Sequence, residues 1–375
     1  DRAARTRLAH HGRHRDVALD LLNRDGLGPP PEQGPGSGPD AEPASRRRAG
    51  RTAVGLFLSS LRLVSLLVAV AIGIFALLAA SPIDPIRAYV GAEARNLSPE
   101  QIAQIEQRWG LDEPPLERFM AWGGQLISGD LGQSQVYGEP VTTVIADRLP
   151  ASLSLMVLAW TLAGIIGFGL GIIAGVHRGR WVDRVCSWWA YTLASAPTFW
   201  VGLVLLYVFS VSLQWTPVCC AAPLGTLPGE ATLLERAHHL ILPAITLSLI
   251  GVSATLLHTR QATIEVMESD HVLFARARGE RLPGLVLHHV VRNAAGPALM
   301  LQFASVGELF GGSILAEQVF TYPGLGQATT EAALRQDIPL LMGVALVTAA
   351  LVFVGNLLGD LAHRWADPRL RGGMR

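Results

Sequence analysis

Six stretches of the chain are apolar over about the length that crosses a bilayer. They lie at about 54–80, 151–176, 186–213, 240–257, 290–315 and 339–358. About 20 apolar residues in a helix span the hydrocarbon core, where every backbone N–H and C=O must be paired within the protein. Only 16% of the residues are charged, below the roughly 25% of soluble domains. We therefore expect an all-α polytopic membrane protein with six transmembrane helices.

Basic residues gather on one side of these apolar segments. Arginine and histidine are concentrated at 46–51, 177–184, 258–292 and 364–375. Loops rich in positive charge remain in the cytoplasm, so these four regions predict that both termini are cytoplasmic. The expected localisation is the plasma (inner) membrane of a prokaryote.

The chain divides into four parts by composition. Residues 1–50 are rich in Arg, Pro and Gly and are expected to form a disordered cytoplasmic tail. Residues 51–81 hold the first transmembrane helix. Residues 82–150 are expected to be an external helical insert between spans 1 and 2, because Ser98-Pro99-Glu100 and Pro114-Pro115 are helix-start signals. Residues 151–371 hold spans 2 to 6 and a cytoplasmic loop at 268–297.

This loop has the pattern of a docking element. Asp270 stands as an N-cap before a short helix, Pro283-Gly284 is a stop signal, and a second helix is expected from Leu285. The short helix carries arginines that hold it at the cytoplasmic surface, and apolar side chains for a partner at Leu273, Phe274 and Leu282. The spacing of residues in this segment is equally compatible with a solvated loop that docks nothing.

Two other positions are weak candidates for lining a pathway. Glu308 lies within the fifth apolar segment, where a carboxylate must be paired, protonated or in contact with water. Ser195 and Pro197 interrupt the third segment and predict a kink or a close helix contact. A role in helix packing is the alternative for Glu308.

Several classes of function receive no support. The formal net charge is zero, which argues against nucleic-acid binding. The three cysteines, Cys186, Cys219 and Cys220, have no zinc spacing. We interpret the adjacent pair as small apolar filler, with a redox or metal-contacting pair as the alternative. The histidines of the tail, His10, His11 and His14, are expected to be solvated.

The motifs together resemble the membrane permease subunits of ATP-binding-cassette importers of the oligopeptide, dipeptide and nickel class. The resemblance covers about 51–371. The loop matches the cytoplasmic segment by which these permeases dock on their ATPase, through Asp270, Val272, Ala275-Arg276-Ala277, Gly279, His289, Arg292-Asn293-Ala294 and Pro297. Further landmarks follow in order: Ile83-Asp84-Pro85, Gly110 to Pro114, Gly129 to Ser134, Arg148-Leu149-Pro150, Ser195 with Pro197, Glu317 with Pro323 to Gly326, Asp337, and Asp367-Pro368-Arg369.

The resemblance implies a transmembrane subunit that moves substrate and does not hydrolyse ATP. No GxxxxGK[ST] nucleotide motif is present in the sequence. The implied partners are a sister permease, two ATPase subunits that bind the ATP, an extracytoplasmic solute-binding protein and the lipid bilayer. No cofactor, metal site or catalytic residue is expected in this chain. The coupling residues implied are Asp270, Phe274, Ala275, Arg276, Ala277, Arg278 and Gly279, within the 270–284 loop.

Some residues depart from the family pattern. Arg278 replaces the usual lysine, Glu280 an apolar residue and His271 a tyrosine, and Pro283-Gly284 is expected to shorten the helix. Peptides and nickel or metal chelates are both open as substrates. The rival classes are a secondary transporter and a membrane-embedded enzyme, but no HExxH, GxSxG or paired intramembrane Asp supports an enzyme.

Overall fold

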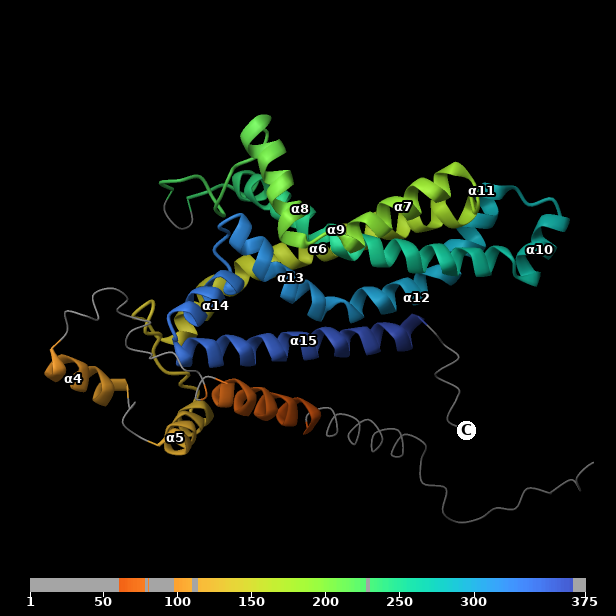
Figure 1. The fold of residues 1–375 in the computed structure, drawn as a ribbon. Coiled ribbons are helices and arrows are strands. Elements are labelled where there is room, and N and C mark those ends of the chain that lie inside the picture. The colour runs from red at the N-terminus through yellow and green to blue at the C-terminus, as the bar shows by residue number, and fades with distance from the viewer. Residues whose placement is uncertain (1–60, 78–79, 81–97, 110–113, 227–229, 367–375) are drawn as a thin grey trace, which may run out of the picture. The chain divides into compact units, whose positions relative to one another are not determined.

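The computed structural model describes residues 61–77, 80, 98–109, 114–226 and 230–366, which belong to one compact unit spanning 60–375. Within these residues all regular structure is helical, apart from a single antiparallel bridge between Gln133 and Pro140 (Figure 1). The expected all-α class is therefore confirmed. The predicted tail at 1–50 lies outside the described residues.

Three described helices are long and apolar enough to cross a membrane unbroken. They are α6 (Val141–Val176), α9 (Leu233–Met267) and the 338–359 part of α15 (Ile338–Ala366). Two bent pairs raise the number to five if each pair is one span, and the helix at 61–77 is apolar but shorter. The count of six spans and the orientation of the termini remain predictions.

The first bent pair joins α7 (Trp181–Ser195) to α8 (Thr198–Leu205) and the π-helix η2 (Leu206–Ser212) at 108°. Pro197 explains this bend, because a proline pushes the residue before it into an extended conformation. Ala196 has φ −84° and ψ 133°, and Pro197 then caps α8. The kink predicted at Ser195 to Pro197 is present.

The second bent pair contradicts a sequence expectation. The fifth span was expected to be continuous over about 290–315, but α12 (Val291–Ala304) ends before Ser305 and α13 (Val306–Val319) continues at an angle of 52°. The Ser305 hydroxyl donates to the carbonyl of Gln302 at 2.9 Å. Such local serine bonds compete with the helical pattern and accompany bends.

The second span also starts earlier than expected. The sequence placed its beginning near Ala151, at the end of the insert, but α6 begins at Val141 and contains Pro150. The charged residues Asp147 and Arg148 lower the hydropathy of these first turns, so the hydropathy pattern placed the start of the span too late. The early turns are nevertheless anchored, since Val141, Val144 and Ile145 are buried against α14 (Leu325–Leu334) and α15.

Among the described helices, α6 and α9 make the most extensive contact. Three glycines of α6 at four-residue spacing face three threonines of α9 at the same spacing: Gly167, Gly171 and Gly175 against Thr255, Thr259 and Thr263. A Cβ on these glycines would lie 2.7, 2.6 and 2.5 Å from the threonine Cβ atoms. Small residues let helix backbones approach closely where water supplies no driving force for association.

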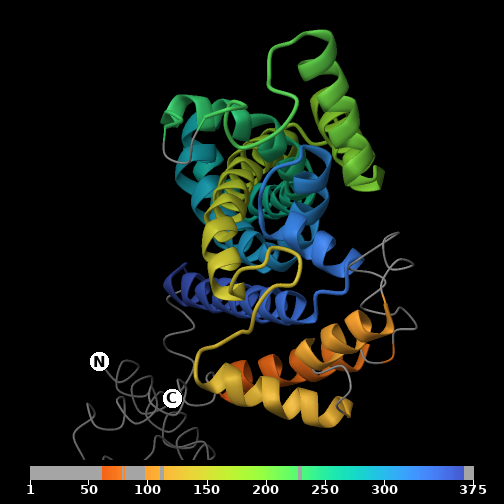
Figure 2. The same ribbon diagram turned by 90° about the vertical axis from the view of Figure 1, so that its left-hand side faces the viewer.

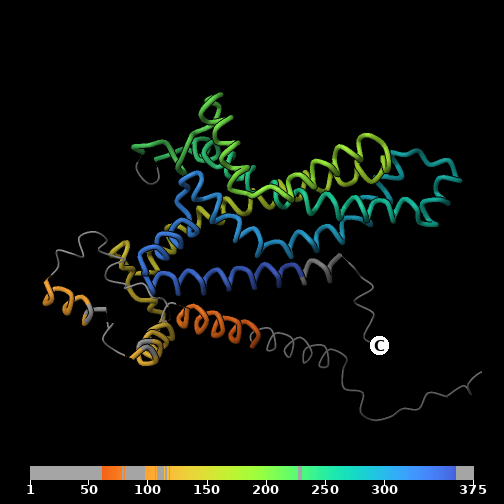
Figure 3. Tube along the Cα trace, in the orientation of Figure 1, coloured from red at the N-terminus to blue at the C-terminus, as the bar shows by residue number. Residues whose placement is uncertain are grey.

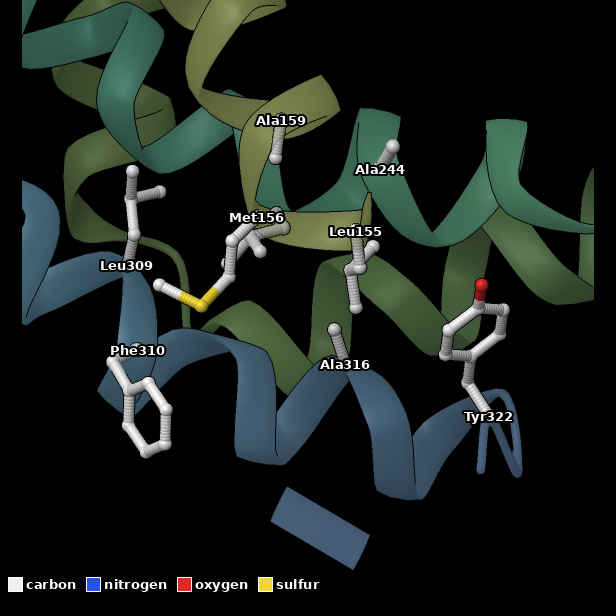
Figure 4. Close-up of a cluster of buried hydrophobic side chains, with 9 residues drawn as sticks. Leu155, Met156, Ala159, Ala244, Leu309, Phe310, Ala316 and Tyr322 are labelled. Carbon is white, nitrogen blue, oxygen red and sulfur yellow. The ribbon is translucent and has the colours of Figure 1, made fainter. Parts of the chain in front are cut away.

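The α13 helix completes this core. Figure 4 shows Leu155 and Met156 of α6 pointing toward α13, with Ala244 of α9 beside them. Gln302 of α12 binds the same helices by polar contacts. Its amide nitrogen donates to the Trp160 carbonyl at 2.6 Å, and its amide oxygen accepts from Thr255 at 3.0 Å. Buried polar groups in a membrane core need such partners.

The remaining short helices lie at the two ends of these long ones. Figures 1 and 3 show α10 (Asp270–Ala277) and α11 (Leu282–Leu285) at one end, together with the C-terminal end of α15. The other end, which faces the viewer in Figure 2, holds α14, α4 (Pro99–Trp109) and α5 (Pro115–Ile127). The basic loop at 268–297 and the insert are therefore at opposite ends.

Candidate functional site

The α10 helix has one anchored face and one free face. Val272 is fully buried and Ala275 nearly so, in a cluster with Met267, Leu285 and Val290. Leu273 and Phe274 point away from this cluster and are 49% and 65% exposed. The fold thus holds α10 in place while leaving apolar side chains available for a partner.

Gly279 ends α10 for a conformational reason. Its φ is +86°, and no atom would lie within 4 Å of a Cβ built on it. Residues with a Cβ rarely adopt this left-handed conformation. It ends a helix because the backbone amides at and after this residue can then donate to carbonyls of the last helical turn. The Gly279 amide donates to Arg276 O at 2.9 Å and the Glu280 amide to Ala275 O at 3.2 Å.

Three details predicted for this segment are wrong. Pro283-Gly284 is not a stop, since both residues lie inside α11, and the second helix starts at Leu282 rather than Leu285. Proline is well suited to the first turn of a helix, where its missing N–H is not needed. The N-cap of α10 is Ser269, and Asp270 is the first helical residue, favourable there by its charge.

The Glu280 carboxylate contacts two histidines of the 268–297 loop. It lies 3.3 Å from His289 Nε2 and 3.5 Å from His288 Nδ1, both in the π-helix η3 (Val286–Val290). The acid that departs from the family pattern therefore links the turn after α10 to the next helix.

Among the other predicted coupling residues, Arg276 reaches the anchored side of α10, where its Nη2 lies 3.8 Å from Met267 Sδ. Arg276, Ala277 and Arg278 are exposed, and the Arg278 guanidinium lies 6.0 Å from the centre of the Phe274 ring. Leu273 and Phe274 are exposed on the same helix as Ala277 and Arg278, so the free side of α10 carries two large apolar side chains and a basic one. We call this the α10 surface.

Two ion pairs join the α9 region to α7 and to the turn before it. Buried Asp183 accepts from Arg260 Nε at 2.5 Å and from Arg260 Nη2 at 2.8 Å, while exposed Arg178 pairs with exposed Glu268. Neither pair was anticipated. The available signal was Asp183, the single acid within the basic 177–184 loop.

Arg260→Ala is expected to lower the stability of the protein by about 3 kcal/mol, because it leaves the buried Asp183 carboxylate without its charge partner. Arg178→Ala is the matched control and should change stability by less than about 1 kcal/mol, since its pair is solvated. Thermal unfolding of the detergent-solubilised protein measures both. Equal losses for the two variants would contradict this assignment.

At the opposite end, the family landmarks form a polar network. Buried Glu317 accepts from the Ser152 hydroxyl at 2.7 Å and from the backbone N–H of Gln327 at 3.0 Å, and Gly324 and Gly326 leave room for its carboxylate. Buried Asp337 accepts from the Ser134 hydroxyl at 2.6 Å. These bonds join α13 to α6 and α14, and they join the segment before α6 to the residue before α15.

Tyr137 adds to this network from the loop before α6. Its hydroxyl donates to Glu331 at 2.5 Å, and the Arg148 guanidinium lies over its ring. Partial burial and the bond to Glu331 raise the pKa of Tyr137 to about 12. The phenol therefore remains protonated and bonded throughout the neutral range.

The weak pathway candidates are not brought together into one site. Ser195 and Pro197 are exposed at the bend between α7 and α8, and the Ser195 hydroxyl bonds to the carbonyl of Tyr191. Glu308 is exposed at the other break, in the first turn of α13.

The adjacent cysteines are not apolar filler. Cys219 and Cys220 are joined by a disulfide, the Cys220 amide donates to the carbonyl of Phe320, and His239 Nδ1 bonds to the carbonyl of Cys219. This turn ties the loop before α9 to the end of α13. Within the described residues, no group of three or more His, Cys, Asp or Glu side chains could hold a metal ion.

The chain matches family models over most of its length. The model for binding-protein-dependent transport system inner membrane components covers residues 167–372, and the model for the N-terminal part of such components covers 56–156. The chain belongs to this family. It is therefore a multi-pass protein of the bacterial inner membrane and a transport component rather than an enzyme.

Curated relatives agree with this assignment. The chain is 32% identical over 308 residues to the oligopeptide transport system permease protein AppB of Bacillus subtilis, covering 82% of the chain and 96% of the relative. It is 36% identical over 309 residues to a putative peptide permease protein of Brucella suis, with the same coverage. It is 35% identical over 312 residues to the di/tripeptide transport system permease protein DppB of Pseudomonas aeruginosa, covering 79% and 92%. The resemblance to permeases of ATP-binding-cassette importers is thereby confirmed.

Proposed function

We propose that this permease forms half of the translocation pathway of an ATP-driven peptide importer and couples to separate ATPase subunits through the 270–284 loop. The observation that carries the coupling role is the division of α10 into an anchored face, with Val272 at its centre, and a free face with Phe274. A helix built in this way can receive a push from a soluble partner and pass it to α9 and α12.

The substrate proposed is a peptide. The three relatives cited are named for transport of peptides, and they match this chain over nearly their full length. The family resemblance also left nickel or metal chelates open, but none of these three names favours that alternative. Identification of the ligand that co-purifies with the solute-binding protein distinguishes the two.

The proposed partners follow from the surfaces that the chain leaves uncovered. Exposed apolar side chains on α7 and α8, among them Trp188, Trp200 and Leu203, suit a sister permease within the membrane. Two ATPases would meet the α10 surface and its equivalent on the sister subunit, and they would bind the ATP. The external segments before α6 and α14 are proposed to meet the binding protein.

Phe274→Ala tests the coupling role. A buried aromatic contributes roughly 1.5–3 kcal/mol to docking, so its loss should weaken ATPase binding by about 10- to 100-fold. The stability of the folded permease should be unchanged, because the Phe274 ring is 65% exposed in this subunit. Binding of purified ATPase to the permease in nanodiscs, followed by light scattering or fluorescence, gives the measurement.

Val272→Ala is the matched control on the same helix. Val272 is fully buried, so its truncation should lower the stability of the subunit by about 2 kcal/mol. Its effect on ATPase binding should be smaller than that of Phe274→Ala. If Phe274→Ala binds the ATPase as tightly as the wild type, the α10 surface is not the docking site.

A further inference from the structure

The α5 helix of the external insert carries an apolar stripe that no described residue covers. Leu116, Met120 and Ile127 are 71%, 67% and 90% exposed. Their spacing of four and eleven residues places them within about 40° of one another around the helix. Gly123 lies in the same stripe, and nothing approaches within 4 Å of a Cβ built on it. The stripe is thus a continuous apolar surface along α5.

The neighbouring side of α5 faces the first apolar helix of the chain. The rings of Phe119 and Phe75 are 5.1 Å apart, and Phe119 also lies beside Trp122 at 6.1 Å. Figure 1 views α5 nearly along its axis, whereas the helix at 61–77 runs across the page and α5 lies at its far end from α10. Figure 2 shows α5 lengthwise beside that helix. The α5 helix therefore lies across the end of a membrane helix.

Polar side chains of α5 lie away from the stripe. Gln125 is exposed and, at 100° per residue, lies about 180° around the helix from Leu116, while exposed Glu117 lies about 100° from Leu116 at the border of the polar face. A helix with one apolar and one polar face, lying across the end of a membrane span, suits the boundary between lipid tails and headgroups. Aromatic residues such as Trp122 are enriched at that boundary.

We propose that α5 is an interfacial helix whose Leu116–Met120–Ile127 stripe is inserted into the bilayer, in the leaflet at the end of the helices opposite α10. Lipid is the occupant because the stripe is continuous with a membrane surface. The helix at 61–77 exposes Ile72 and Leu77 at the end where Phe75 meets Phe119. The bilayer that covers those side chains continues onto α5.

This placement has a consequence for the external side of the permease. With α5 embedded at a fixed depth, the loop from Gly129 to Pro140 starts at the membrane surface and leads directly into α6. A soluble partner would then meet this loop and α14 rather than the apolar stripe. The inference depends on the family assignment and the membrane location, and it is independent of the substrate and of ATPase docking.

Photo-crosslinking from inside the stripe tests the proposal. A benzophenone amino acid is placed at Met120 in one variant and at Gln125, on the polar face, in another. Both side chains are exposed, so the subunit should fold with either label. The full chain is expressed with its transport partners in bacterial cells, illuminated in the native membrane and examined by mass spectrometry. The same label at exposed Ile72 is the positive control for lipid adducts.

The expected result is a lipid adduct at position 120 comparable with that at 72, and little or none at 125. Three outcomes would overturn the proposal: adducts at 120 formed chiefly with a protein, whether the binding protein, another transporter subunit or a second copy; equal lipid adducts at 120 and 125; or no lipid adduct at 120 when position 72 forms one.

Discussion

Gly171→Leu is expected to prevent accumulation of the folded permease. A Cβ at this position would lie 2.6 Å from the Thr259 Cβ and 2.8 Å from the carbonyl oxygen of Leu256. One of these neighbours is backbone, so a rotamer change cannot relieve the overlap, and α6 would have to move away from α9. Overpacking a core by a few methylene groups usually costs about 1–3 kcal/mol, and a backbone clash between α6 and α9 should exceed that.

The matched control is Gly169→Leu on the same helix. Nothing lies within 4 Å of a Cβ built on Gly169, so leucine there should be accepted and should gain the roughly 1 kcal/mol by which it exceeds glycine in helix propensity. Fluorescence-detected size-exclusion chromatography of fusion proteins measures the yield of monodisperse permease. A monodisperse Gly171→Leu peak at wild-type yield would show that α6 and α9 are not held by this contact.

The interface between α6 and α9 was predictable from the sequence only in part. The four-residue spacing of Gly167, Gly171 and Gly175 is visible in the sequence, as is the spacing of the threonines of α9. Which helix faces which is decided by the packing of all the spans together, and a single sequence does not specify it. The same holds for Gln302. A polar residue in a span predicts that a hydrogen-bond partner exists, but the sequence does not identify Trp160 and Thr255 as its partners.

Features governed by local chemistry were predicted more accurately. The bend at Pro197 follows from the steric effect of proline on the residue before it, and a short helix near Asp270 was predicted although its N-cap and stop signal were assigned to the wrong residues. The break at Ser305 and the start of α6 at Val141 were not predicted, because a serine or a pair of charged residues is compatible with several backbone courses. At the α10 surface, the sequence pattern identified Leu273 and Phe274 as apolar residues available to a partner, whereas only the structure shows that Val272 is buried.

Gly279→Val is expected to leave a folded, membrane-inserted permease that no longer transports. The φ of +86° is strained for a β-branched residue by about 1–3 kcal/mol, although the space around the Cβ is open. The strain is relieved by changing the turn after Ala277, which alters how the α10 surface is presented to the ATPase. The buried contacts of Val272 and Ala275 remain, so the yield of folded protein should be close to that of the wild type.

Uptake of a labelled peptide by cells, compared with ATP hydrolysis by the purified transporter in liposomes, separates the expected effects. Gly279→Val should reduce uptake much more than the ATPase rate, because hydrolysis no longer moves the permease. Gly279→Asn is the matched control and should retain more uptake, since asparagine adopts the left-handed conformation more readily than valine. A valine variant that imports at the wild-type rate would mean that the Gly279 turn does not transmit the motion, and the coupling role would then have to be assigned to another part of the 268–297 loop.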